Sequence, residues 1–222
     1  MGKIEEIYGE NQSKFFFNNL YKARRKLFNL ILNHISEDDQ IIDIGTTPVS
    51  EKHENFFLHH YQYPENITCF SNQNLENLKA IFPTLKTLNG DGRDTKLNNN
   101  SYDIAISNAT LEHVGSFRKQ CDFVKELHRI SKKRCIISTP NRFYPLDAHT
   151  MLPLIHWLPK NLHRKILTFL KYDFLAKEEN LNLLSKNDLI KICEINNFVN
   201  FKILKLKFYS ITSNLILIIE KN

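Results

Sequence analysis

Apolar residues follow two patterns along this chain: short runs that are almost wholly apolar, and longer stretches in which apolar residues recur at helical spacing. The short runs predict buried β-strands, and the longer stretches predict amphipathic helices. Before residue 140, the predicted strands are residues 40–44, 66–70, 85–88, 102–107 and 134–138. The predicted helices in the same part are residues 13–35, 72–82 and 116–130, with a loop and a short irregular helix over 46–63. Strands that alternate with helices in this way are typical of a parallel sheet covered on both faces.

The alternation breaks after Pro140. Residues 141–184 contain several prolines and large apolar side chains, and they include a basic amphipathic stretch at residues 160–172. Proline fixes the backbone and removes a donor, so this segment should form a covering outside the sheet rather than another strand. We therefore expect residues 141–184 to lie as a lid over one edge of the sheet.

The C-terminal part predicts one more helix and two more strands. The helix covers residues 186–197, and Ser185 with Asp188 gives it the start of a capping box. Two apolar runs, 199–206 and 215–220, follow with a link too short for a parallel crossover, so they should pair antiparallel at the sheet edge. The predicted fold class is α/β, with a seven-stranded, mostly parallel sheet, an antiparallel final strand and helices on both faces.

Length and composition are those of one ordinary globular domain. The chain has 222 residues, 42% hydrophobic and 24% charged, so residues 1–222 are expected to form a single domain. The formal net charge of +6 comes largely from scattered lysines, and no nucleic-acid module is present, so no nucleic-acid partner is expected. The N-terminal residues lack the apolar region of a secretory signal, and no apolar run is long enough to span a membrane. A cytoplasmic location is therefore expected.

Metal and disulfide chemistry have no clear pattern in the sequence. The four cysteines are widely spaced and form no CxxC pair, which favours reduced thiols in the core. His53, His59 and His60 lie close together, but their spacing is not that of a regular ligand set, and no cysteine is near. No metal site is therefore expected.

The first predicted strand ends on an acidic residue and a glycine, Asp43 and Gly45. Nucleotide-binding α/β domains open their ligand crevice at such a strand end. Glycine lets the backbone turn sharply and lie close to a ligand, and the carboxylate of Asp43 can accept a hydrogen bond from a hydroxyl or an ammonium group. The same residues occur by chance at many strand ends, so the order of the later segments decides the interpretation.

Those later segments resemble the class I S-adenosylmethionine-dependent methyltransferases, which have a Rossmann-like fold. The stretch GDGRDTKLNNNSYDIAISNATLEHVG, residues Gly90–Gly115, is similar to the branch of that class that acts on small molecules. The stretch STPNRFYPLDAHTMLPLIHWLP, residues Ser138–Pro159, is similar to members associated with sugar and cell-envelope biosynthesis. The glycine-rich first motif is atypical, because Thr47 and Val49 stand where the family has glycines.

The resemblance implies S-adenosylmethionine as the cofactor and assigns residues to its parts. These residues match the positions that hold the methionine end, the ribose, the adenine and the amino end, in that order: Asp43, Gly45, Thr46 and Thr47; Ser71 and Asn72; Gly92, Arg93 and Asp94; and Asn108. The family usually has a carboxylate at the ribose position, whereas Ser71 and Asn72 are neutral.

The residues expected near the transferred methyl group are histidines and an aspartate. Asp147 and His149 follow the fifth strand, at the edge where ligands bind in such sheets, and a histidine near its normal pKa suits proton removal from a hydroxyl. His113 is a further candidate. A structural or substrate-orienting role for His149, and a packing role for His113, stay open at this point.

The sequence therefore predicts a methyltransferase that uses S-adenosylmethionine to methylate a small-molecule or glycan-like acceptor, with oxygen as the expected methylated atom. Two alternatives remain. The chain could keep the fold as a binding or scaffold protein without catalysis, which the missing glycines suggest. It could also be a peripheral membrane module that makes weak surface contact through the basic amphipathic stretch, residues 160–172.

Overall fold

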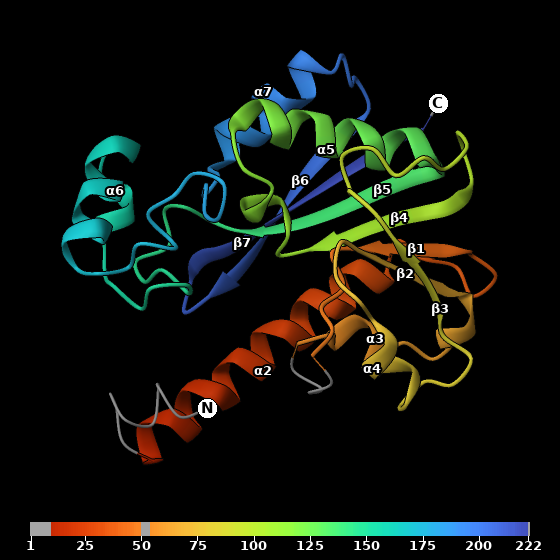
Figure 1. Ribbon diagram of the computed structural model, residues 1–222, viewed down its shortest axis with the longest axis horizontal. Helices are drawn as coiled ribbons and strands as arrows, with labels where there is room; N and C mark the ends of the chain where they lie inside the picture. Colours follow the sequence, from red (N-terminus) through yellow and green to blue (C-terminus); the bar gives the residue numbers. More distant parts are fainter. Residues whose placement is uncertain (1–9, 50–53, 222) are drawn as a thin grey trace.

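The computed structural model of the protein describes residues 10–49 and 54–221. The described chain forms a seven-stranded sheet in the order β3-β2-β1-β4-β5-β7-β6, in which β7 is antiparallel to its neighbours and the other strands are parallel (Figure 1). The strands are β1 (Ile41–Ile44), β2 (Ile67–Ser71), β3 (Lys86–Asn89), β4 (Tyr102–Asn108), β5 (Ser131–Pro140), β6 (Phe201–Phe208) and β7 (Ile211–Glu220). The predicted fold class is confirmed.

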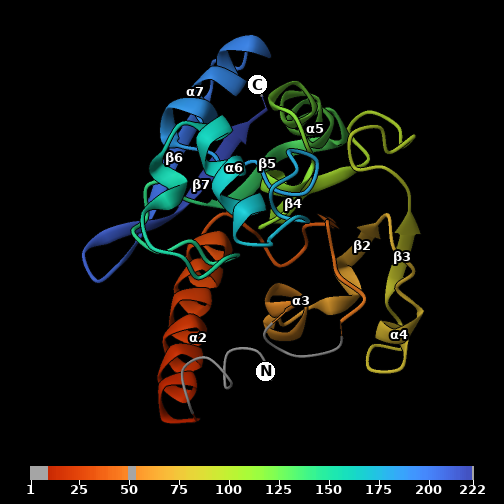
Figure 2. The ribbon, with the colours of Figure 1, turned by 60° about the vertical axis from the view of Figure 1, so that its left-hand side comes forward.

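Helices cover both faces of this sheet (Figures 1 and 2). The α-helices are α2 (Glu10–Leu32), α3 (Phe56–His60), α4 (Glu76–Lys79), α5 (Phe117–Ile130), α6 (Lys160–Phe169) and α7 (Lys186–Ile195). Three short 3-10 helices are η1 (Pro64–Asn66), η2 (Leu111–His113) and η3 (Ile155–Trp157). Within the described residues, no helix combines the length and the apolar character needed to cross a membrane.

The core has two halves, one on each face of the sheet. Successive side chains of a strand point to opposite faces, so Ile41 packs with α2, α3 and α4, while Ile42 and Ile44 pack with α5 and α7. A central parallel strand is buried on both sides, which explains why β1 is apolar apart from Asp43 and why residues 104–106 of β4 are apolar. This burial fixes the strand ends, and with them the loops that form the site.

Local sequence signals account for the helix starts that matter for the site. The Ser116 side chain caps α5 by accepting from the N–H of Lys119. Ser185 and Asp188 form the predicted capping box of α7, in which each side chain accepts from the other residue's backbone N–H. Both helices therefore begin where the sequence placed them.

The structure differs most clearly from the predicted elements in two regions. The helix expected over residues 72–82 is the single turn α4, because Asn74 accepts from the N–H of Glu76 just before it and Pro83 follows. The strand predicted at residues 199–206 lies two residues later, at 201–208, and the strand predicted at 215–220 begins earlier, at Ile211. The two strands meet at Tyr209 and Ser210, whose φ angles are positive, at 47° and 65°. Two left-handed residues make a tight hairpin turn that matches the twist of the strands.

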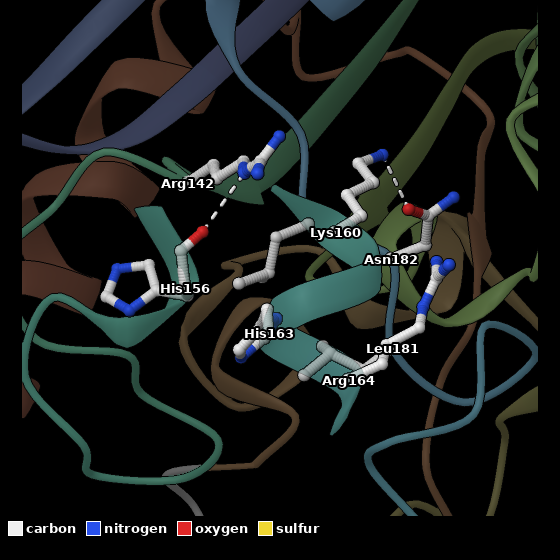
Figure 3. Close-up of a pocket in the computed structure, with 8 residues that line it drawn as sticks. Arg142, His156, Lys160, His163, Arg164, Leu181 and Asn182 are labelled. Atoms are coloured by element: carbon white, nitrogen blue, oxygen red, sulfur yellow. Dashed lines mark hydrogen bonds between the residues drawn. The ribbon is translucent and has the colours of Figure 1, made fainter. Parts of the chain in front are cut away.

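The segment that follows β5 leaves the sheet and lies beyond one end of it, with α6 apart from the helices that cover the faces (Figures 1 and 2). Two backbone hydrogen bonds hold its ends: Asn141 N–H donates to Ser213 O at 2.8 Å, and Arg142 N–H donates to Leu184 O at 2.9 Å. The segment encloses a small polar pocket (Figure 3). The break in the sequence pattern after Pro140 therefore corresponds to a separate covering outside the sheet.

Candidate active site

The loop after β1 is built around Gly45. Its φ angle is +102°, a conformation that residues with a side chain rarely adopt. A Cβ atom there would lie 2.1 Å from the Thr110 hydroxyl oxygen, so the loops after β1 and β4 touch at this point. The Gly45 N–H also donates to the carbonyl oxygen of Phe70 at 2.9 Å. Gly45 therefore brings the carboxyl ends of β1, β2 and β4 together, as expected for a crevice at a topological switch point.

Asp43 is the acidic group at this crevice. Its side chain is buried, and burial raises the pKa of the Asp43 carboxyl to about 7, while hydrogen bonding by Thr46 offsets only part of the shift. Among the described residues, no lysine, arginine or histidine pairs with it. A carboxyl group in this state would gain most from a ligand that brings a positive charge.

A side chain that the sequence prediction missed holds the atypical loop that follows. Asn55 accepts from the Thr47 N–H at 3.2 Å and donates to the carbonyl oxygens of Thr47 and Val49 at 2.9 and 2.8 Å. Thr46 donates its hydroxyl to the carbonyl oxygen of Asp43 at 3.2 Å. Asn55 thus shapes the loop where the family uses glycines, and it occupies the backbone N–H of Thr47, one of the residues expected at the methionine end of the cofactor.

The predicted ribose position lies at the end of β2. Ser71 is buried, and its hydroxyl accepts from the N–H of Gln73 at 3.2 Å, whereas Asn72 is exposed. The Ser71 carbonyl oxygen accepts from Gly90 N–H at 3.0 Å, so the loop after β3 starts beside it. Ser71 is therefore at the same sheet edge as Gly45, and Asn72 points to solvent beside it.

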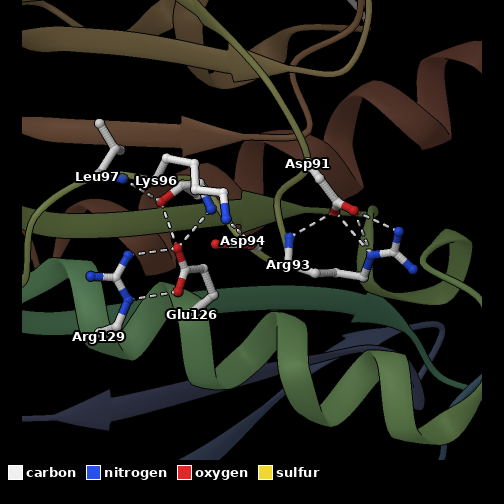
Figure 4. A network of polar contacts seen from close by, with 8 residues as sticks. Asp91, Arg93, Asp94, Lys96, Leu97, Glu126 and Arg129 are labelled. Atoms are coloured by element: carbon white, nitrogen blue, oxygen red, sulfur yellow. Dashed lines mark hydrogen bonds and ion pairs between the residues drawn. The ribbon is translucent and has the colours of Figure 1, made fainter.

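The turn at residues 90–94 closes against the crevice through Gly92. A Cβ atom on Gly92 would lie 2.8 Å from side-chain atoms of both Ile44 and Phe123, so its backbone packs directly over the end of β1. Arg93 and Asp91 form an ion pair at 2.6 Å, and Asp94 pairs with Lys96 at 2.5 Å (Figure 4). Gly92, which was expected beside the adenine, therefore lies against the end of β1.

The base of the same turn is fixed by a polar network (Figure 4). Glu126 of α5 accepts from the Thr95 N–H at 2.8 Å and from its hydroxyl at 2.6 Å, and it pairs with Arg129 at 2.7 Å. This network anchors residue 95 while leaving Asp94 largely exposed. Asp94 can therefore exchange Lys96 for a ligand without loss of the anchor.

Asn108 ends β4 at a hollow on the α2 side of the sheet. Its side-chain oxygen accepts from the hydroxyl of Ser138 on β5, which fixes its orientation. The hollow has about 360 Å³ of empty space, part of it open to solvent. Its lining is mainly apolar, from α2, α3 and β4, with these polar or charged members: Arg24, Ser107 and Asn108. Asn108 therefore faces a space between the sheet edge and the N-terminal helix.

The structure brings the predicted catalytic residues into one cluster. His149 Nδ1 lies 3.0 Å from an Asp147 carboxylate oxygen, and His149 Nε2 lies 3.9 Å from Oε1 of Glu112. His113 packs edge-on against the His149 ring, and its Nδ1 donates to Asn180 O at 2.6 Å. Asp147 is buried, whereas the His149 side chain is 17% exposed. His149 therefore has its Nδ1 anchored and its Nε2 facing Glu112.

Glu112 is the residue that the sequence prediction undervalued. It is fully buried, one of its oxygens accepts from the Thr139 hydroxyl at 2.9 Å, and the other has no hydrogen-bond partner within the described structure. Ser138 and Thr139, which are consecutive at the end of β5, thus hold Asn108 and Glu112 respectively. The histidine cluster and Asn108 consequently lie at the same edge of the sheet.

The two carboxylates control the protonation of His149. Burial lowers the pKa of His149, but the hydrogen bond with Asp147 and the charges of Glu112 and Asp147 outweigh it, so the pKa is raised above its usual value. Burial alone would raise the pKa of Asp147, but contacts with His149 and Thr150 lower it to about 2. Asp147 is therefore ionised at neutral pH, and His149 has an increased affinity for a proton.

Comparisons with known proteins agree with this fold. Residues 56–138 match the methyltransferase domain family. The fold resembles a SAM-dependent methyltransferase from Thermotoga maritima, at 16% identity over all of both chains with a TM-score of 0.60. It also resembles 1,6-didemethyltoxoflavin-N1-methyltransferase from Burkholderia thailandensis, solved with S-adenosylhomocysteine, at 10% identity over 98% of this chain and 85% of that one, with a TM-score of 0.61. No curated protein sequence matches the chain.

The class that these findings support is a methyltransferase with a Rossmann-like fold. More particularly, they support an S-adenosylmethionine-dependent enzyme, with S-adenosylmethionine as its cofactor. This agrees with the resemblance read from the sequence; the acceptor and the roles of single residues belong to the proposal that follows.

Proposed function

We propose that the protein transfers a methyl group from S-adenosylmethionine to a hydroxyl of a small-molecule or glycan-like acceptor, with His149 as the proton acceptor. The observation that carries this proposal is the placement of His149 between Asp147 and Glu112, at the sheet edge that also holds Asn108. The cofactor supplies an electrophilic methyl group on a sulfonium. The protein must then align the acceptor and remove its proton.

The residues present fit the cofactor at its charged end. The Asp43 carboxyl is buried, and no described cation pairs with it, so an ammonium group would supply the missing charge and a hydrogen-bond donor. Asn108 would face the same end of the cofactor, and the Gly92 backbone would lie beside the adenine. Asp94 would accept from the adenine amino group once it leaves Lys96.

His149 would act through Nε2. Its Nδ1–H is held by Asp147, which fixes the tautomer with a free lone pair on Nε2. Nε2 would take the proton from the acceptor hydroxyl. The imidazolium that forms would be stabilised by the unpartnered oxygen of Glu112, because the buried carboxylate then has a positive partner. Asp147 and Glu112 are positioning residues in this scheme, and His113 flanks the ring.

The segment at residues 141–184 would form the lid over the acceptor within a single domain of residues 1–222. Phe143 and Trp157 support an acceptor with a flat apolar face such as a sugar ring, because both are about half exposed and they pack edge-on with ring centroids 6.4 Å apart. The segment also carries Asp147 and His149, so closing it over an acceptor would bring the base to the hydroxyl.

Calorimetry with S-adenosylmethionine, followed by detection of S-adenosylhomocysteine in the presence of hydroxylated sugars and small phenols, tests the proposal. We expect binding, and product formation that depends on the acceptor. Binding without any turnover on these acceptors would favour the scaffold alternative, and no binding at millimolar cofactor would contradict the cofactor assignment itself.

A substitution at the ribose position gives a sharper test. Ser71→Asp should leave S-adenosylmethionine affinity unchanged or improve it by up to about tenfold, because a carboxylate makes stronger hydrogen bonds to two ribose hydroxyls than a neutral group does. Calorimetry measures the affinity, and Asn98→Asp, which adds the same charge at an exposed position outside the expected site, is the control. A large loss of affinity in a folded Ser71→Asp protein would show that the ribose lies elsewhere.

A further inference from the structure

The segment at residues 141–184 encloses a second hollow that the scheme above does not use (Figure 3). It has about 260 Å³ of empty space, part of it open to solvent. Five of its lining residues are basic or imidazole side chains: Arg142, His156, Lys160, His163 and Arg164. Asn182 completes the polar lining and also ties the hollow to the active-site cluster, because its N–H donates to Glu112 O at 2.7 Å.

The positive charge in this hollow is only partly balanced by the described residues, among them Glu178 and Asp188. Arg164 pairs with Glu178 at 3.0 Å, but no described carboxylate lies within ion-pair distance of Arg142 or Lys160. Burial is the main cause that lowers the pKa of both Arg142 and Lys160, because their charged forms have lost water. An anion would compensate the charge of these partly buried cations. A lysine on the solvated surface needs no such partner, because water stabilises its charge.

The cations also have contacts within the protein, and these leave donors free. Arg142 donates from Nε to His156 O at 3.1 Å and from Nη2 to Leu158 O at 2.7 Å, which leaves the Nη1 protons without a described acceptor. Lys160 donates one proton to the Asn182 side chain at 2.6 Å. These bonds position the two cations, and the remaining donors are available to a ligand.

Two buried histidines add unpartnered nitrogen atoms to the same wall. His156 is 2% exposed and His163 is 9% exposed, and both line the hollow. Nδ1 of His156 and Nε2 of His163 have no partner within the described structure, although buried polar atoms are nearly always hydrogen-bonded. His156 uses its other nitrogen on Tyr144 O at 2.7 Å. The unpartnered nitrogens therefore point to a polar ligand in the hollow.

We propose that this hollow binds a phosphoryl group, and that the group is carried by the acceptor. Three cations and two imidazoles around one space suit a tetrahedral oxyanion with charge on several oxygens, whereas a flat carboxylate needs one bidentate partner. A neutral imidazole nitrogen can accept from a P–OH, and a protonated one can donate to P–O⁻. Asn182 links this hollow to the Glu112 cluster, so the phosphoryl group would anchor a phosphorylated sugar whose hydroxyl faces His149. This assignment to the acceptor rests on the proposed function, whereas the phosphoryl site itself does not.

Titration with inorganic phosphate tests the site without any need for turnover. Calorimetry gives the dissociation constant, and the ring C–H resonances of the histidines in NMR spectra report where the ion binds. We expect the signals of His156 and His163 to shift and sulfate to compete, while the signals of histidines outside the hollow, such as His34 and His128, stay in place. A shift pattern without His156 and His163 would overturn the proposal.

Substitutions separate this site from general surface attraction. Arg164→Gln and Lys160→Gln should each weaken phosphate binding by about tenfold or more, as expected for loss of a charge-assisted hydrogen bond. Lys165→Gln is the matched control, because it removes the same charge from an exposed neighbouring position on α6. Equal weakening in all three variants would mean attraction by net charge alone and would overturn the proposal.

Two further arms distinguish the source of the phosphoryl group and separate this proposal from the methyltransferase assignment. Glucose 1-phosphate should bind at least about threefold more tightly than inorganic phosphate if the group belongs to a sugar-like acceptor; equal or weaker binding would restrict the site to the free ion and refute the acceptor part. S-adenosylmethionine affinity is measured on the same samples. Phosphate binding without cofactor binding would support the phosphoryl site and refute the proposed function. Cofactor binding without phosphate binding would refute the phosphoryl site and leave the proposed function standing.

Discussion

Asp43→Asn should weaken S-adenosylmethionine binding by about 10- to 100-fold, the effect of losing a charged hydrogen-bond partner, and should stabilise the protein without its cofactor. Both effects have one cause, which is the buried carboxyl at the end of β1. Its pKa is about 7 in the folded protein and 3.8 in the reference state, so folding favours the neutral acid. In the proposed function, the ammonium group of the cofactor would pair with the ionised form.

The raised pKa of Asp43 makes the free energy of unfolding depend on pH. Because the folded pKa is raised, the stability that the neutral acid provides is fully present below about pH 4 and is lost as the pH rises to about 7. Asparagine cannot ionise, so Asp43→Asn should keep this stability, and its advantage at pH 8 should reach at most about 4 kcal/mol. Urea unfolding at pH 5 and pH 8, with and without cofactor, measures both terms.

Asp173→Asn is the matched control, since it makes the same substitution at an exposed position. It should leave both the cofactor affinity and the free energy of unfolding nearly unchanged. If Asp43→Asn binds S-adenosylmethionine as the wild type does, the carboxylate does not contact the ammonium group. If its stability follows the same pH curve as the wild type, a different group carries the pH dependence.

The sheet could be predicted because its strands carry their own signal. In the strands around β1 and β4, burial on both faces demands continuous apolar runs, and helices with one buried face demand helical spacing, so both are visible without tertiary information. Helical spacing alone also predicted too long a helix over residues 72–82. Leu75 and Leu78 are buried as the spacing requires, but Ile81 is 46% exposed. Two buried side chains hold only one helical turn there.

The site was less visible because its contacts join distant parts of the chain. Asp147 and His149 were found from their place after the fifth strand, but Glu112 was not singled out as a site residue, and only the fold shows that Thr139 and His149 contact it. The role of Asn55 could not be predicted for the same reason. Its side chain bonds to the backbone of Thr47, eight residues earlier, and of Val49, six residues earlier, at the positions where the family has glycines. Sequence spacing reports neighbours on one element, whereas these contacts depend on loop shape.

The basic stretch at residues 160–172 shows a similar limit. Its amphipathic pattern did not by itself assign a helix, and the structure forms the helix α6 there. The pattern could not show which of its cations face inward. Lys160 and Arg164 line the hollow, while Lys165 is exposed. The sequence suggests that these basic side chains form a solvated surface, but two of them, Lys160 and Arg164, line a hollow inside the segment.

His149→Ala should lower the turnover number by roughly 10²–10⁴-fold, the usual contribution of a positioned general base, with S-adenosylmethionine affinity within about threefold of wild type. Asp147→Asn should also lower turnover, because the carboxylate that holds Nδ1–H is lost. His113→Ala is the matched comparison: its Nδ1 is already bonded to Asn180 O, and its Nε2 lies 4.0 Å from the same Glu112 oxygen that His149 faces. A larger loss for His113→Ala than for His149→Ala would assign the base to His113.

The pH profile separates a base from a residue that only shapes the pocket. Turnover should rise with pH as His149 loses its proton, with a midpoint above the ordinary histidine value because Asp147 and Glu112 raise the pKa. Glu112→Gln removes one of those charges while its side-chain oxygen can still accept from Thr139, so the midpoint should move to lower pH. An unchanged midpoint in a folded Glu112→Gln protein that binds cofactor normally would mean that His149 does not carry the proton.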